Sequence, residues 1–334
     1  MNETDWAAQT FEPIEFVADR LDIASPHPEL RTLTDPHIAA KLLTAETRSR
    51  LEAVLEHFPG TPTILLSGGV DSIFVAAVAA QLGIRPHAIT IVTSGETDGA
   101  AAAAAAQALG LTHDIIRLSA DDVVHLARDV MNRLETSELW EVTAGIPLVA
   151  ARRSFDQISD LGPILTGSGA DAILGGGRKL TYPVDSIDAR DELDRLIRAE
   201  SASNFREMRL IPHFYPALLD AYADRLVHIF QTVRWWQVVE NFAPPALFGD
   251  HDGRPVDKLA LRIACSEQLP DGSEQLAWGT KAPIQRSSGL MEVLAGAARG
   301  YAAELPGART YTNPMTEDAE SVATRLYLAI LQKS

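Results

Sequence analysis

The sequence predicts an α/β fold, with a mainly parallel sheet covered by helices on both faces and a helical C-terminal half. Three observations support this. Short apolar runs alternate with helical patterns from Thr61 to Gly177, which is typical of a parallel sheet. Two of the apolar runs continue into glycine-rich sequence, at 67–72 and 166–176. Beyond Gly177 the apolar spacing is mostly that of helices.

The elements up to the first glycine-rich stretch are an extended segment, a long helix and a buried strand. Residues 1–36 carry scattered prolines and no sustained period, so we expect them to be extended and partly wrapped around the body. Apolar residues at helical spacing predict a helix over 38–58 that ends at Pro59-Gly60. The run 63–66 is a strand, and 73–82 resumes as a helix. We therefore treat 1–60 as a lead-in to an α/β core at 61–180.

The remaining elements follow from the same periodicities. Ser119 and the acids after it suit a helix N-terminus. In the core we expect strands at 87–93, 112–118 and 163–166, and helices at 97–109, 121–134 and 142–158. In the closing region, 181–334, we expect helices at 187–200, 218–239, 256–267, 290–304 and 318–331.

Composition restricts the class of protein and its partners. The chain has 334 residues, enough for one large domain or two closely joined ones, with 46% hydrophobic and 22% charged residues. No apolar run is long enough to cross a bilayer and the acidic start lacks a signal segment, so we expect a cytoplasmic protein without membrane contact. A formal charge of −16 opposes nucleic acid as a partner. Cys265 is the only cysteine, which excludes an internal disulfide and weakens any sulfur-transfer function.

The first glycine-rich stretch is a candidate phosphate site. A strand, a glycine turn and a helix place backbone N–H groups in a crevice at the carboxyl end of the strand. Serine hydroxyls can donate to the same anion. A carboxylate beside phosphate needs a cation between them, so Asp71 is a candidate magnesium ligand. The alternative is a turn that merely joins strand to helix. The candidate nucleotide-binding residues are Leu66, Ser67, Gly68, Gly69, Asp71 and Ser72.

The second stretch repeats this arrangement. The strand ending at Thr166 leads into Gly167-Ser168-Gly169, and then into a short helix that begins near Asp171. If both turns lie at one edge of the sheet, Asp71 and Asp171 could hold a single cation from two sides. The alternative is a capping turn in which Asp171 complements a helix dipole. The residues alone leave these two interpretations open.

Ser67–Ser72 resembles the PP-loop of the ATP pyrophosphatases, which include asparagine, GMP and NAD synthetases and several tRNA-modifying enzymes. The second stretch, 166–176, is similar to a signature of the synthetase domain of asparagine synthetase, which β-lactam and carbapenam synthetases share. The resemblance covers about residues 38–304. It implies a PP-loop fold like that of the adenine nucleotide α-hydrolases, with ATP and Mg²⁺ as cofactors. It places Thr166 and Gly167 near the nucleotide, Val92 beside the adenine, and Asp171 on the metal.

A third segment matches the lactam-forming members of that family. They place a lysine, six residues and then Ser-Gly on a loop over the active site, a spacing that Lys281, Ser288 and Gly289 fit. The resemblance implies that Lys281 stabilises charge as an acyl-adenylate forms and is attacked. The alternative is an exposed loop with a solvated lysine.

The resemblance implies an AMP-forming amide or lactam synthetase of specialised metabolism, acting on a small carboxylate and an amine. The residues before Thr61 are too few for the glutaminase domain of these enzymes, so we expect the amine to come free, from the substrate itself or from another protein. An amine-supplying or carrier protein and a homo-oligomer both stay open. Ser168 stands where the family has Glu or Tyr, a residue that handles the amine's proton; acids at 135, 138 and 141 are substitutes. The alternatives are tRNA or thiol modification, and a catalytically silent nucleotide-binding subunit.

Overall fold

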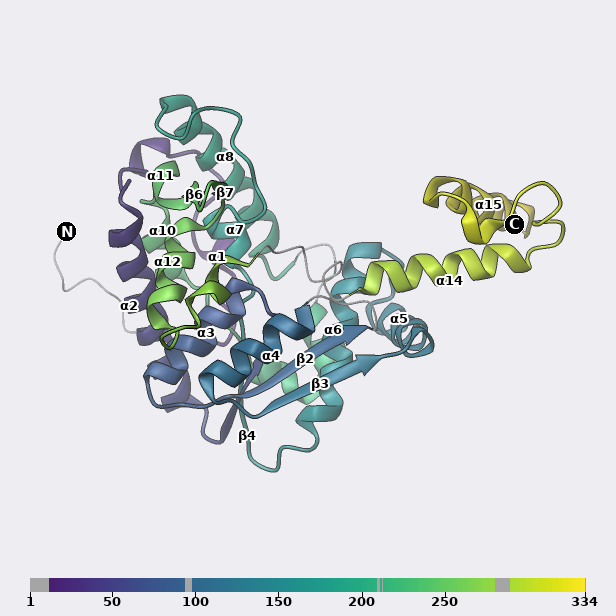
Figure 1. The fold of residues 1–334 in the computed structure, drawn as a ribbon, viewed down its shortest axis with the longest axis horizontal. Helices are drawn as coiled ribbons and strands as arrows, with labels where there is room; N and C mark the ends of the chain where they lie inside the picture. Colours follow the sequence, from purple (N-terminus) through teal and green to yellow (C-terminus); the bar gives the residue numbers. More distant parts are fainter. Residues whose placement is uncertain (1–11, 94–97, 209–210, 212, 280–288, 334) are drawn as a thin grey trace.

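A five-stranded parallel sheet forms the centre of the molecule (Figure 1). The computed structural model describes residues 12–93, 98–208, 211, 213–279 and 289–333. The strand order is β3-β2-β1-β4-β5. The chain runs outward from β1 to β3 and then returns to the other side of β1, so the order reverses between β1 and β4. Ligands of open α/β sheets bind at such a reversal. The strands are β1 (Thr61–Leu65), β2 (His87–Thr93), β3 (His113–Leu118), β4 (Leu161–Thr166) and β5 (Leu226–His228).

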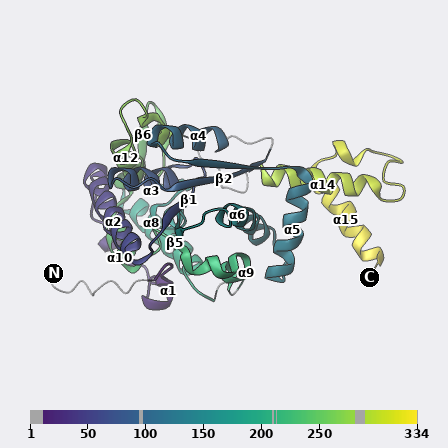
Figure 2. The same ribbon diagram turned by 90° about the horizontal axis from the view of Figure 1, so that it is seen from below.

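Helices cover both faces of this sheet, as the sequence predicts. Figure 2 shows α3 (Val70–Gln81) and α4 (Asp98–Leu109) on one face, and α5 (Ala120–Leu134) and α6 (Leu139–Phe155) on the other. Helix α3 is buried from Val70 to Ala79, because α2 (Pro36–His57) and α12 (Leu259–Gln268) pack over it. Such all-round burial explains why its sequence is apolar on every side.

Side-chain caps set the starts of several helices. Asp35 accepts hydrogen bonds from the N–H groups of His37 and Ile38, at 2.8 and 3.2 Å, and so begins α2. Ser119 and Asp122 form a reciprocal capping box at the start of α5, which confirms the predicted N-terminus there. These local contacts explain why the helix boundaries could be read from sequence.

The prediction of one helix over 218–239 was wrong. This stretch holds α9 (Phe214–Leu219), a 3₁₀ turn η2 (Asp220–Arg225), strand β5 and α10 (Val233–Val239). Strand β5 has three residues, all buried, so its apolar spacing does not distinguish strand from helix. Because β5 pairs with β4, the sheet extends beyond residue 180. A hairpin of β6 (Gly249–His251) and β7 (Arg254–Val256) also interrupts the helical half.

The remaining elements surround this core or extend from it. Two of them, α14 and α15, stand away from the sheet (Figure 1). Each helix among the described residues is too short or too polar to span a bilayer. These elements are α1 (Val17–Arg20), η1 (Pro28–Leu30), α7 (Ala170–Leu174), α8 (Ile187–Asn204), α11 (Pro244–Leu247), η3 (Glu274–Trp278), α14 (Leu290–Glu304), η4 (Pro314–Thr316) and α15 (Ala319–Lys333).

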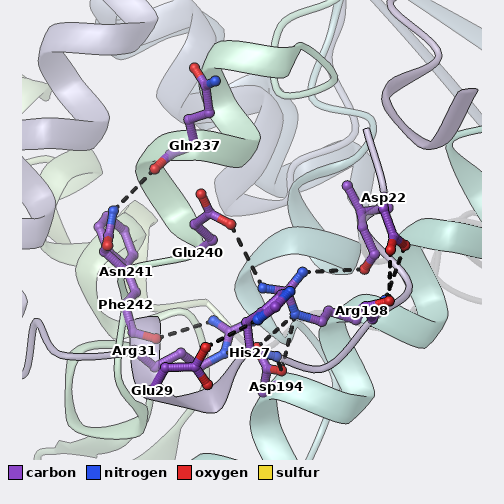
Figure 3. A network of polar contacts seen from close by, with 12 residues as sticks. Asp22, His27, Glu29, Arg31, Asp194, Arg198, Gln237, Glu240, Asn241 and Phe242 are labelled. Carbon is purple, nitrogen blue, oxygen red and sulfur yellow. Dashed lines mark hydrogen bonds and ion pairs between the residues drawn. The ribbon is translucent and has the colours of Figure 1, made fainter. Parts of the chain in front are cut away.

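A buried ionic cluster fastens the N-terminal segment to the helical half (Figure 3). The Asp194 carboxylate on α8 accepts hydrogen bonds from Arg31 Nε at 2.8 Å, Arg198 Nε at 3.0 Å and the His27 backbone N–H at 2.7 Å. The Glu240 Oε2 atom lies 3.7 Å from Arg198 Nη2. Burial lowers the pKa of Arg31 and raises that of Glu240. The cluster holds α8 in place, and α8 in turn packs against α7, which carries Asp171.

Candidate functional site

The first glycine-rich turn lies between β1 and α3 and is closed by two serines. The Ser67 backbone N–H donates to Ser72 Oγ at 3.1 Å, and the two Oγ atoms lie 3.2 Å apart. Ser72 Oγ donates in turn to the Gly69 carbonyl at 3.1 Å. Gly68 has φ of 73°. The turn therefore places the half-buried Ser67 hydroxyl beside the N–H groups of the first turn of α3, and these are the donors that an anion site requires.

The second turn follows β4 and is held by a residue of β5. Thr166 Oγ1 lies 2.7 Å from His228 Nδ1, and the same oxygen accepts from the Ser168 N–H at 3.2 Å. Thr166 and His228 are buried, whereas Ser168 is exposed. His228 was missed in the sequence because its strand was assigned to a helix. It fixes the side chain that begins the second turn.

The two turns are in direct contact. A Cβ added to Gly167 would lie 2.7 Å from the Ser72 backbone nitrogen and 2.8 Å from the Asp71 carbonyl carbon. Real Cβ atoms do not come so close to backbone, so only glycine fits here. The expectation that both turns share one edge of the sheet is therefore met by the geometry. They lie at the carboxyl ends of the adjacent strands β1 and β4.

Asp71 and Asp171 face each other across a lysine that the sequence did not single out. Lys258 Nζ donates to Asp71 Oδ1 at 2.6 Å and to Asp171 Oδ1 at 2.7 Å. Lys258 and Asp71 are buried, whereas the Asp171 side chain is 46% exposed. A Cβ on Gly176 would lie 2.0 Å from Asp171 Oδ1, so Gly176 leaves room for this carboxylate. The pair has one sheltered and one open carboxylate, joined by a single ammonium.

Lys258 itself has an unusual backbone conformation. Lys258 has φ of 50° and occupies the N-cap of α12, a conformation that non-glycine residues seldom adopt. Sequence analysis placed this lysine inside a helix over 256–267. The residues beside it, Asp257 before and Leu259 after, carry no signal of a contact with two carboxylates.

Asp257 connects the second turn to the closing region. Its carboxylate accepts from the Gly177 N–H at 2.5 Å and from Arg262 Nη2 at 2.9 Å. Burial alone would raise the pKa of Asp257, but these hydrogen bonds outweigh it and hold the pKa below its usual range. Arg262 also donates to the carbonyls of Ala277 and Gly279, each at 3.0 Å. Asp257 and Arg262, which lie before and after Lys258 in the sequence, thus hold this segment in place beside the second turn.

The other predicted site residues have different outcomes. Leu66 and Val92 are buried at the ends of β1 and β2, and their predicted nucleotide contacts stay predictions. Lys281 and Ser288 lie outside the described residues. Gly289 has φ of 78° and is the N-cap of α14. Of the substitute acids, Glu138 caps α6 by accepting from the Glu141 N–H at 2.9 Å.

The paired carboxylates fit a magnesium ion that is shared with phosphate. Mg²⁺ prefers oxygen ligands and is commonly held by one or two carboxylates together with substrate phosphates and water. In the described part of the chain, no group of three or more His, Cys, Asp or Glu side chains could hold a metal. Asp71 and Asp171 already lie around one positive charge, and Asp171 is open to solvent. Two carboxylates in this position suit a metal that arrives with its phosphates.

Fold and site together define an α/β protein with paired glycine-rich turns around two carboxylates, at the reversal point of a parallel sheet. The family model described as asparagine synthase matches residues 59–304. The chain therefore belongs to the asparagine synthase family, which confirms the resemblance seen in the two motifs.

Individual relatives match shorter parts of the chain. Asparagine synthetase [glutamine-hydrolyzing] 2 of Arabidopsis thaliana is 33% identical over 148 residues, 41% of this chain and 25% of the relative. Asparagine synthetase [glutamine-hydrolyzing] 1 of the same plant is 32% identical over 125 residues, which cover 34% of this chain and 21% of the relative. The chain thus matches about a quarter of these relatives' length. NMN synthetase from Francisella tularensis has 14% identity and a TM-score of 0.32, covering 64% of this chain and 98% of its own.

Proposed function

We propose that this chain is an ATP-dependent, AMP-forming synthetase that joins a carboxylate to an amine as an amide or lactam, in specialised metabolism. The observation that supports it most is the meeting of the two turns, with Asp71 and Asp171 on one ammonium. Membership of the asparagine synthase family supports the same class of reaction. Because the reaction consumes ATP, we place it in the cytoplasm.

The first turn is suited to the pyrophosphate portion of ATP. Ser67, Gly68, Gly69 and Ser72 would donate hydrogen bonds to phosphate oxygens from hydroxyls and N–H groups. Asp71 and Asp171 would hold Mg²⁺, which neutralises phosphate charge when bound. Thr166 and Gly167 would border the nucleotide from the second turn. The helix dipole of α3 points its positive end at the same place.

The proposed reaction consists of two nucleophilic displacements, the first at phosphorus and the second at the acyl carbon. A carboxylate oxygen attacks the α-phosphorus, and the bond from that phosphorus to the bridging oxygen breaks, releasing pyrophosphate. The amine nitrogen next attacks the acyl carbon, AMP leaves with the oxygen, and the nitrogen loses a proton. Positioning and charge stabilisation are the chain's main contributions.

Lys258 adds a cation at the point where pyrophosphate charge develops. Its ammonium lies beside both carboxylates, so a triphosphate bound next to them would offer it a further anionic partner. A buried ammonium next to a leaving pyrophosphate stabilises the transition state more than an exposed one, since water does not screen it. Lys281 is proposed to act on the acyl side of the same reaction.

The amine must lose a proton, and Ser168 stands at the position that handles this proton in the family. Ser168 is exposed at the second turn, and its backbone N–H is bonded to Thr166. A serine hydroxyl needs a neighbouring base to accept a proton. An amine delivered by a separate supplying or carrier protein could bring that base with it. Thiol chemistry is disfavoured, because burial raises the pKa of the Cys265 thiol and keeps it protonated.

Exchange of labelled pyrophosphate into ATP tests the proposal. The wild-type chain with Mg²⁺ is expected to exchange label only when a suitable carboxylic acid is added, and to release AMP when an amine follows. Replacing Asp171 with asparagine is expected to slow exchange by about 100-fold or more, because a metal ion contributes several kcal/mol of charge stabilisation. Binding of ATP without exchange, across a broad panel of acids, would instead indicate a silent nucleotide-binding subunit.

A further inference from the structure

The C-terminal arm, residues 290–333, comprises α14, η4 and α15 and extends away from the body (Figures 1 and 2). Leu290 anchors its start, buried in the same apolar cluster as residues of α5. Beyond this point α14 packs against η4 and α15, and the arm buries Ala302, Ala308, Pro314 and Val322. The arm is therefore a helical hairpin attached to the body at one end.

The arm exposes much apolar surface for its size. It contains seven of the sixteen exposed large apolar side chains among the described residues. On α15, Tyr327, Leu328 and Ile330 are 60%, 58% and 65% exposed. The solvent side of a surface helix is normally polar. An exposed cluster of this kind marks a surface that another molecule covers.

Charged side chains of the arm form hydrogen bonds with one another inside the hairpin. Arg325 donates to Glu317 at 2.5 and 2.8 Å, and Arg299 Nε donates to the Glu317 carbonyl at 3.2 Å. The bonds to Arg325 hold the pKa of Glu317 at about 2. These contacts close the hairpin from within. The apolar face of α15 is left as the outer surface.

Helix α14 adds a second, independent feature. Gly296 and Gly300 are four residues apart, and a Cβ at either would meet no atom within 4 Å. Glycine inside a helix costs about 1 kcal/mol relative to alanine. Residues four apart share one face of a helix, so this face lets another helix come close.

The distribution of charge indicates what covers the arm. Residues 290–333 hold four basic and five acidic residues, a formal charge of −1, whereas the rest of the chain carries −15. Two copies that met through their bodies would repel each other strongly. Two arms can meet almost without net charge, and the bodies stay apart because each arm extends away from its own body.

We propose that the arms of two copies of this chain pack against each other, along the glycine face of α14 and the outer face of α15. The contact is isologous, as in most two-fold homodimers, and joins two hairpins into a four-helix arrangement. It is independent of the proposed catalytic function.

Sedimentation velocity and light scattering on the full chain test this inference. The wild type is expected to have the mass of a dimer. The double substitution Leu328→Glu and Ile330→Glu is expected to raise the dissociation constant about tenfold or more and to yield monomer, since it places charges at the centre of the contact. Gly296→Leu should act in the same direction by holding the helices apart. Circular dichroism checks that each variant is folded.

The matched control is Ile187→Glu. Ile187 is 73% exposed at the start of α8, on the body, so this variant removes an apolar residue that is even more exposed but lies away from the arm. It is expected to stay dimeric. A wild type that is monomeric at all concentrations would overturn the inference. So would a folded double variant that dimerises like the wild type, or a control that dissociates equally.

Discussion

Replacing Lys258 with methionine is expected to lower kcat/KM by about 100- to 1,000-fold, the effect of removing one preorganised charge or donor from a transition state. Methionine keeps most of the apolar stem but removes the ammonium that contacts Asp71 and Asp171. The two carboxylates would then repel both each other and an incoming triphosphate. Steady-state kinetics with varied ATP, on the acid identified by pyrophosphate exchange, measures the loss.

The control for this variant is Lys179→Met. Lys179 is exposed three residues after Gly176, so its removal changes the net charge equally without changing the site. The kcat/KM of this variant is expected to remain within about twofold of the wild-type value, in keeping with the small effects of exposed charges. Thermal unfolding with saturating ATP separates a catalytic loss from unfolding. If folded Lys258→Met retains nearly full activity, Lys258 does not act on the phosphates.

Replacing Asp194 with alanine is expected to destabilise the chain by about 3–5 kcal/mol, the usual cost of breaking a buried ion pair by removing one partner. The substitution leaves the buried Arg31 and Arg198 without their common acceptor, and it also removes the acceptor of the part-buried His27 N–H. Urea unfolding followed by circular dichroism gives the change in the free energy of unfolding.

Asp188→Ala on the same helix is the matched control. Asp188 is exposed in the first turn of α8, where a carboxylate contributes at most about 1 kcal/mol through the helix dipole. Equal losses in the two variants would mean that the buried cluster adds nothing specific. Because α8 packs against α7, we also expect Asp194→Ala to weaken ATP binding indirectly.

The parts of the fold that depend on neighbouring residues in sequence could be predicted from it. The cap at Ser119, the strand-turn-helix at Leu66–Ser72 and the helix α2 all depend on patterns within one or two turns. The second glycine-rich turn was identified for the same reason. That the two turns meet followed from the rule that parallel strands end at one edge.

The parts that depend on distant residues could not be predicted. Lys258 lies 187 residues from Asp71, and nothing in its own neighbourhood indicates a contact with two carboxylates. Strand β5 is three residues long and fully buried, so only its pairing with β4 distinguishes it from a helix. In the sequence, Asp194 is one of many acids on a polar helix. Its role follows only from its contact with Arg31, which lies 163 residues earlier.

A crystal structure with Mg²⁺ and α,β-methylene-ATP, which cannot be split at the α,β position, would test the central claim most directly. The account predicts the triphosphate on the backbone between Ser67 and Ser72, the metal in contact with Asp71 and Asp171, and the Lys258 ammonium turned toward the phosphates. A triphosphate bound elsewhere, or a metal that touches neither carboxylate, would contradict it.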